Sequence, residues 1–194
     1  MKSKKTDNAN LGSKLLLRRY FLDKCFGKNE FAVLDCCQGS QVIWGTLRRE
    51  YKCRYMGVDI KSKEGRLKID SKRLLQINAD KFDVIDIDTY GSPLLHITAL
   101  IPLVKKRVIL FLTYGQVRMG GGNFDHSIKN ILGFNFEVPN SIGVSLQLRL
   151  FDELVSGVIS PGATIDECLE APRSSHARYL GLVVSPVPAR TQLA

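Results

Sequence analysis

The chain repeats one pattern, in which a short apolar run is followed by a turn and then by a stretch with helical periodicity. The runs predicted as strands are residues 31–35, 55–60, 66–70, 82–88 and 107–113, and the predicted helices are residues 15–22, 41–50, 71–77 and 92–104. Strands that are apolar almost throughout are buried on both faces, which is typical of a parallel sheet between helices. The pattern therefore predicts an α/β fold with a doubly wound, mostly parallel sheet.

The pattern weakens after Gly120-Gly-Gly122, although two further helices are predicted at residues 124–132 and 141–155. The last two apolar segments, residues 164–170 and 178–184, suit a C-terminal antiparallel hairpin. With 194 residues, 44% of them hydrophobic, the chain is long enough to bury a substantial core. We expect a basic helical extension over residues 1–29 and one domain over residues 30–194.

Four acidic residues lie at or near the ends of predicted strands: Asp35, Asp59, Asp70 and Asp88. Each alone could simply end a strand or cap the next helix. Together they would meet, because the carboxyl ends of parallel strands lie on the same side of the sheet. Open α/β sheets bind their ligands outside these carboxyl ends. The sequence therefore indicates a ligand site lined by carboxylates.

The turn after the first predicted strand contains one glycine, Gly39. A dinucleotide site would need the G-x-G-x-x-G pattern, which lets the backbone approach a pyrophosphate. An adenosine ligand without phosphates needs less: one close backbone approach, a carboxylate for the ribose hydroxyls and an acceptor near the adenine amine. Gly39, Asp59 and Asp70 can supply these three.

Three segments, residues 33–40, 57–60 and 86–93, carry a resemblance to class I S-adenosylmethionine-dependent methyltransferases, which have a Rossmann-like sheet. The third, Asp-Ile-Asp-Thr-Tyr-Gly-Ser-Pro, resembles the D-x-D-P-[FY]-G-S-P signature of the tRNA (guanine-N2)-dimethyltransferase family. The resemblance implies S-adenosylmethionine as cofactor. It assigns the methionine end to Asp35, Cys36 and Gly39, the ribose to Asp59 and Ile60, and the adenine to Asp70 and Ser71.

The same resemblance implies methyl transfer to an exocyclic amine of a nucleobase. A positioned carboxylate can raise the reactivity of such an amine as positive charge develops on it, and Asp88 is the candidate. Tyr90 would stack on the extruded base. The alternative is a structural turn, in which Asp88 caps the helix that Pro93 begins.

Two positions depart from the family patterns, because Thr89 replaces a proline and Gln41 replaces a glycine. These departures keep a second hypothesis open, a catalytically inactive methyltransferase-fold subunit that binds nucleic acid or a partner protein. A small-molecule methyltransferase is a third, which the charge distribution disfavours.

The net charge of +9 is concentrated in residues 1–119, which hold 23 of the 28 Lys and Arg but 12 of the 19 Asp and Glu. A phosphate backbone is a common partner for such a basic segment, although a solvated surface is the simpler explanation. We expect nucleic acid as partner, RNA ahead of DNA. Arg18 and Arg19, on a predicted basic helix face, are the candidate phosphate contacts.

The five cysteines contain no C-x-x-C pair, so neither a disulfide framework nor a metal site is expected, and we interpret them as buried thiols. His96 and Trp44 are interpreted as packing residues rather than catalytic ones. No apolar run is long enough to span a membrane and no secretory signal is evident, so the expected location is cytoplasmic.

Overall fold

A computed structural model of the protein describes residues 10–61, 67–89, 91–115, 133, 151–172 and 177–187. The described helices are α1 (Leu11–Cys25), α2 (Val42–Glu50), α3 (Ser71–Asn78), α4 (Leu94–Leu100) and α7 (Phe151–Ile159), with 3-10 turns η1 (Ala79–Lys81) and η2 (Ile101–Leu103). The described strands are β1 (Phe31–Asp35), β2 (Cys53–Asp59), β3 (Leu67–Lys68), β4 (Val84–Ile87), β5 (Val108–Gly115), β6 (Ala163–Glu170) and β7 (Ala177–Pro186).

These strands form one sheet in the order β3-β2-β1-β4-β5-β7-β6. The pairs from β3 to β5 are parallel, whereas β7 is antiparallel to both β5 and β6. The strand order reverses between β1 and β4, the position at which open α/β sheets bind their ligands. The structure thus confirms the predicted α/β class and the C-terminal hairpin, and it shows that β7 pairs with β5 while β6 forms the edge.

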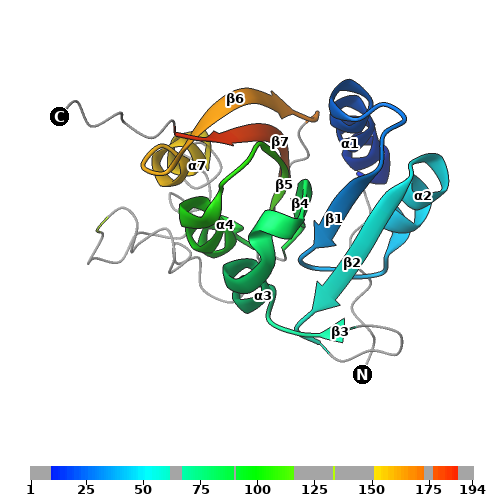
Figure 1. Cartoon of the computed structure of the whole chain (residues 1–194), viewed down its shortest axis with the longest axis horizontal. Helices are drawn as coiled ribbons and strands as arrows, with labels where there is room; N and C mark the ends of the chain where they lie inside the picture. Colours follow the sequence, from blue (N-terminus) through cyan, green and yellow to red (C-terminus); the bar gives the residue numbers. More distant parts are fainter. Residues whose placement is uncertain are drawn as a thin grey trace.

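Helices cover both faces of the sheet (Figure 1). On one face α1 and α2 pack over inward-pointing residues such as Val33, Val84 and Phe111. On the other face α3, α4 and α7 pack over the alternate residues of the same strands, such as Leu34 and Ile85. Successive residues of β1, β4 and β5 therefore enter opposite cores, which explains why these strands are apolar throughout.

Several predicted boundaries differ from the structure. The third strand is only two residues long, Leu67–Lys68, at the exposed edge of the sheet. The predicted helix over residues 92–104 is α4 followed by η2, because Pro102 has no backbone N–H with which to continue the helical hydrogen bonds. Of the two helices predicted after Gly122, residues 124–132 lie outside the described residues, and residues 151–155 form the start of α7.

Helix α1 is not a separate element on the surface. Phe21 and Leu22 are fully buried in the core shared with α2 and the sheet. No helix among the described residues is long and apolar enough to span a membrane.

Candidate functional site

A buried ion pair joins α1 to β4 at the carboxyl end of the sheet. Arg18 Nε and Nη2 donate to the two carboxylate oxygens of Asp86 at 2.8 and 2.7 Å. Trp44 Nε1 of α2 donates to the same carboxylate at 2.7 Å. Each of the three side chains is almost completely buried. Trp44 therefore packs in the core, as predicted, and also satisfies a buried carboxylate.

Asp88 directly follows β4, and it pairs with Lys14 of α1, which lies one helical turn before Arg18. Lys14 Nζ lies 2.9 and 2.7 Å from the two oxygens of Asp88, and the two side chains are 7% and 22% exposed. Burial alone would raise the pKa of Asp88, but the charges of Lys14 and Arg18 and the hydrogen bond from Lys14 outweigh burial, so this pKa lies below its usual value. Asp88 is therefore an ionised carboxylate that solvent can still reach.

These two pairs correct the expectation for the N-terminal helix. Arg18 was predicted to contact phosphates, but it is 1% exposed and bound to Asp86, so this prediction is wrong. Arg19 is on the surface and forms two bonds of 2.7 Å with Glu50. The basic residues at positions 14 and 18 face the sheet because buried carboxylates require cations there.

Asp35 is the third carboxyl group at this end of the sheet. It accepts hydrogen bonds from the Tyr55 hydroxyl at 2.8 Å and from the Cys37 backbone N–H at 3.2 Å. Burial raises the pKa of Asp35 to about 8, and the neighbouring charge of Asp86 adds to this effect. Among the described residues no cation forms an ion pair with Asp35. Its carboxyl group is therefore mainly protonated at neutral pH.

The turn between β1 and α2 carries two residues with left-handed backbone conformations, Gly39 (φ 49°) and Gln41 (φ 61°). Gln41 is the position at which many methyltransferases have glycine, and it adopts the conformation that glycine favours. The turn is closed by a 2.9 Å bond from Gln41 N to Gln38 O, and Gln38 N donates to Val58 O of β2 at 3.0 Å.

Gln38, which the sequence analysis did not single out, is buried beneath this turn. Its amide lies so close to Gly57 that a Cβ at position 57 would come within 2.7 Å of it. Its side-chain carbonyl Oε1 is buried and has no hydrogen-bond partner among the described residues. Buried acceptors are usually satisfied, so this oxygen is a candidate ligand contact. The one signal in the sequence is Gly57 in the neighbouring strand, because a glycine there leaves room for the Gln38 side chain.

The remaining predicted cofactor residues lie along the carboxyl ends of β2 and β3. Asp59 ends β2, and its Oδ1 accepts from Lys61 N at 2.9 Å. Ile60 beside it is 67% exposed. Asp70 caps α3 by accepting from Lys72 N at 3.0 Å. A bond of 3.2 Å from Ile69 N to Asp59 O holds these two carboxyl groups on one edge.

Ser71 and Cys36 have other surroundings. The Ser71 hydroxyl lies 2.9 Å from His96 Nε2, and burial, followed by the charge of Lys72, lowers the pKa of His96 to about 4. His96 is therefore a neutral, largely buried residue, as predicted, but it is not fully satisfied, because its Nδ1 is buried and has no hydrogen-bond partner among the described residues. Cys36 N donates to Asp86 O at 2.8 Å, while its thiol lies in the core on the α3 and α4 side. Tyr90 lies outside the described residues.

The other cysteines differ from the expectation of buried thiols. Only Cys36 is buried, Cys168 is exposed and the remaining three are partly exposed. Burial raises the pKa of Cys37 well above its usual value, which makes a thiolate nucleophile unfavourable. The described residues contain no cluster of His, Cys, Asp and Glu that could hold a metal ion.

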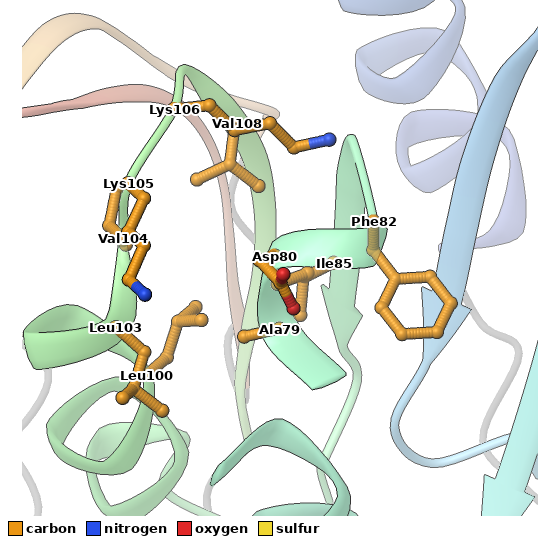
Figure 2. A pocket seen from close by; sticks show the side chains of 10 residues that line it. All are labelled: Ala79, Asp80, Phe82, Ile85, Leu100, Leu103, Val104, Lys105, Lys106 and Val108. Atoms are coloured by element: carbon orange, nitrogen blue, oxygen red, sulfur yellow. The ribbon is translucent and has the colours of Figure 1, made fainter. Parts of the chain in front are cut away.

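Some exposed basic residues lie at the carboxyl ends of the strands and others at the amino ends. Helix α2 runs from the carboxyl end of β1 to the amino end of β2, so Arg48 and Arg49 at its end lie away from Asp88. Among the described residues, the basic side chains with access to solvent near the carboxyl ends of β2 and β3 are Lys61, Lys68, Lys72 and Arg73. A pocket lined by Asp80, Lys105 and Lys106 also lies at the amino end, next to the starts of β4 and β5 (Figure 2), and belongs to no part of the candidate site.

Neither a family model nor a curated protein matches the sequence. Solved structures do match the fold. Trm1 from Pyrococcus horikoshii with S-adenosyl-L-methionine aligns with a TM-score of 0.62 and 14% identity over 91% of this chain. The N-methyltransferase NodS from Bradyrhizobium japonicum WM9 aligns with a TM-score of 0.52 and 14% identity over 93% of this chain and 99% of NodS.

A putative hemolysin from Streptococcus thermophilus also aligns, with a TM-score of 0.53 and 12% identity over 95% of this chain and 70% of that protein. The chain spans about half of Trm1, 54% of its length. At these identities the comparison establishes the fold. The resemblance to S-adenosylmethionine-dependent methyltransferases that residues 33–93 carry is therefore confirmed at the level of architecture.

Proposed function

We propose that the chain is an S-adenosylmethionine-dependent N-methyltransferase that acts on an exocyclic amine of a nucleobase, in RNA in preference to DNA. The observation that carries the proposal is the ionised, solvent-accessible Asp88 next to the switch point of a methyltransferase fold. The 86–93 segment that holds Asp88 resembles the tRNA (guanine-N2)-dimethyltransferases, and Trm1, which has that activity, is among the similar structures.

The residues at the carboxyl edge fit the proposed cofactor. Within the part of the chain that the structure describes, Asp35 is a buried carboxyl group without a cation and Gln38 Oε1 is a buried acceptor without a donor, so a cationic amino group would satisfy both. The methionine part of S-adenosylmethionine carries such an amino group. We assign this part of the cofactor to Asp35, Cys36 and Gly39, and we add Gln38 to these residues. Asp59 and Ile60 would hold the ribose, and Asp70 and Ser71 the adenine.

When bound, S-adenosylmethionine would supply an electrophilic methyl group on a sulfonium, whose sulfur leaves as a neutral thioether when a nucleophile attacks the methyl carbon in line. The lone pair of the amine nitrogen forms the new N–C bond while the C–S bond breaks and its electrons go to sulfur. The nitrogen then loses a proton to Asp88 or to solvent. Asp88 accepts an N–H bond before transfer, which orients the amine and stabilises the charge that develops on it. Tyr90, two residues later, would stack on the base.

A second candidate function is a methyltransferase-fold subunit without catalytic activity. Two departures from the family patterns favour it, Gln41 at a position where many methyltransferases have glycine and Thr89 in place of proline. Such a protein would bind nucleic acid or a partner and transfer no methyl group.

The test is transfer of a labelled methyl group from S-adenosylmethionine to total RNA and total DNA, followed by nucleoside mass spectrometry. We expect a methylated amine in the RNA, and Asp88→Ala should slow transfer by about 100-fold while changing cofactor affinity by only a few fold. Asp80→Asn, an exposed carboxylate at the opposite edge, is the matched control. Cofactor binding without transfer to any nucleic acid would favour the inactive subunit.

A further inference from the structure

We propose that Lys14 determines the class of amine that the site accepts. Together, Lys14 and Asp88 form a donor and an acceptor side by side, which fits a neutral ring-conjugated amine next to an acceptor atom and excludes cationic alkyl amines. This inference rests on the proposed function, and it adds a residue, Lys14, that selects the amine and that the sequence pattern does not assign.

The position of Lys14 is fixed by the contacts of α1. Arg18, one helical turn later, is locked to Asp86 by two hydrogen bonds, and both side chains are buried. The Lys14 ammonium lies over the Tyr179 ring, 5.0 Å from its centroid. An incoming amine therefore meets a lysine that is held by its counterion and by an aromatic ring, and it cannot displace the ammonium without breaking both contacts.

The pair keeps free positions for a substrate. Asp88 has four lone-pair positions on its two oxygens, of which the bonds from Lys14 use one on each and the hydrogen bond from the Thr113 side chain uses a third, so one stays open. Two of the three N–H donors of Lys14 point to Asp88, and the third has no hydrogen-bond partner among the described residues. The site can thus accept one N–H bond at Asp88 and donate one N–H bond from Lys14.

This arrangement matches the edge of a nucleobase. In adenine, cytosine and guanine the exocyclic amine is a donor, and a ring nitrogen beside it is an acceptor. An alkyl amine such as a lysine side chain lacks the adjacent acceptor and is protonated at neutral pH. At Asp88 it would place a second positive charge next to the Lys14 ammonium, where like charges repel more strongly than in bulk water because both side chains of the pair are partly buried.

The experiment compares two acceptors with the full-length chain. An unstructured RNA containing all four bases and a lysine-rich peptide without aromatic residues are offered separately with labelled S-adenosylmethionine. Wild type should prefer the RNA. Lys14→Met should shift the RNA-to-peptide rate ratio toward the peptide by about tenfold or more, since donor and repulsion are lost together. Lys14→Arg, which keeps the charge, should retain most of the preference. Lys24→Met, on the exposed side of the same helix, should retain all of it.

A second readout does not depend on activity. The carboxyl carbon of Asp88, followed by NMR in the free protein, should titrate at a higher pH in Lys14→Met than in wild type, because the counterion is gone. The same change should move the acidic limb of the transfer rate to higher pH. A folded Lys14→Met variant with an unchanged rate ratio would overturn the inference while leaving the proposed function intact. Wild-type protein that transfers to neither acceptor would overturn the proposed function, and the inference with it.

Discussion

Arg18 of α1 and Asp86 of β4 are joined by two hydrogen bonds of 2.8 and 2.7 Å, and Lys14 and Asp88 form a second pair beside them. The spacing of the two cations along α1 matches the spacing of the two carboxylates at the end of β4, because four residues of helix and two residues of strand both advance by roughly 6 to 7 Å. Since the earlier residue of the helix pairs with the later residue of the strand, α1 runs antiparallel to β4. One helix face thus supplies both cations that the Asp-x-Asp segment requires.

Removing Arg18 should strongly destabilise the fold. Arg18→Ala leaves Asp86 buried with the Trp44 hydrogen bond as its one remaining side-chain partner among the described residues, and losing one partner of a buried pair costs about 3 to 5 kcal/mol. Arg19→Ala breaks an exposed pair and should cost less than about 1 kcal/mol. Urea denaturation of both variants measures the difference. Equal destabilisation by the two substitutions would show that the buried pair does not hold α1.

Asp35 should make the protein less stable as pH rises. Its pKa in the fold is about 8, above that of the unfolded chain, so the folded state holds the extra proton between about pH 4 and pH 8. The stabilisation is complete below pH 4 and is lost toward pH 8, with a slope of at most about 1.4 kcal/mol per pH unit. Asp35→Asn should remove this slope in melting curves recorded between pH 5 and 9. A slope that persists in the variant must arise from another group.

His96 should act in the opposite direction. Its pKa in the fold is about 4, below the unfolded value, so the unfolded chain binds the extra proton between pH 4 and about 6.5. Its contribution to stability is present above about pH 6.5 and is lost as pH falls toward 4. The ring signals of His96 in an NMR titration report this directly. Titration near pH 6.5 would mean that the imidazole is not held neutral by its surroundings.

Nucleic-acid binding should depend on the basic residues at the carboxyl edge. We expect the double variant Lys72→Ala with Arg73→Ala to reduce the slope of log affinity against log salt by about one to two units, as loss of one or two phosphate contacts does. Arg48→Ala with Arg49→Ala removes the same charge from the amino edge and is the matched control. Fluorescence anisotropy with a labelled RNA at several salt concentrations measures both. Equal effects of the two pairs would argue against binding at the carboxyl edge.

The sequence predicted those parts of the fold that depend on local pattern. Continuous apolar runs identified β1, β4 and β5, and the acids at the strand ends located the edge that carries Asp35, Asp59 and Asp88. Partners far apart in sequence were not predictable in this way. Lys14 and Asp88 are 74 residues apart, and a periodic set of basic residues on a helix is usually a solvated face.

Gln38 shows the same limit at shorter range. Its burial depends on Gly57 in the neighbouring strand, and strand register cannot be read from residues 38 and 57 alone. The position of β7 between β5 and β6 likewise depends on long-range pairing, although both strands of the hairpin were recognisable from their composition. Local signals therefore predicted the helices and strands, whereas the ion pairs and protonation states of the site depend on tertiary contacts.

The most direct test of the account is isothermal titration calorimetry of the full chain with S-adenosylmethionine. Wild type should bind it, and Asp59→Ala should weaken binding by about 1 to 3 kcal/mol because ribose hydroxyls lose their acceptor. Asp80→Asn, at the opposite edge of the sheet, should bind as wild type does. Absence of binding by wild type at millimolar S-adenosylmethionine would contradict the proposed cofactor and the methyltransferase function that depends on it.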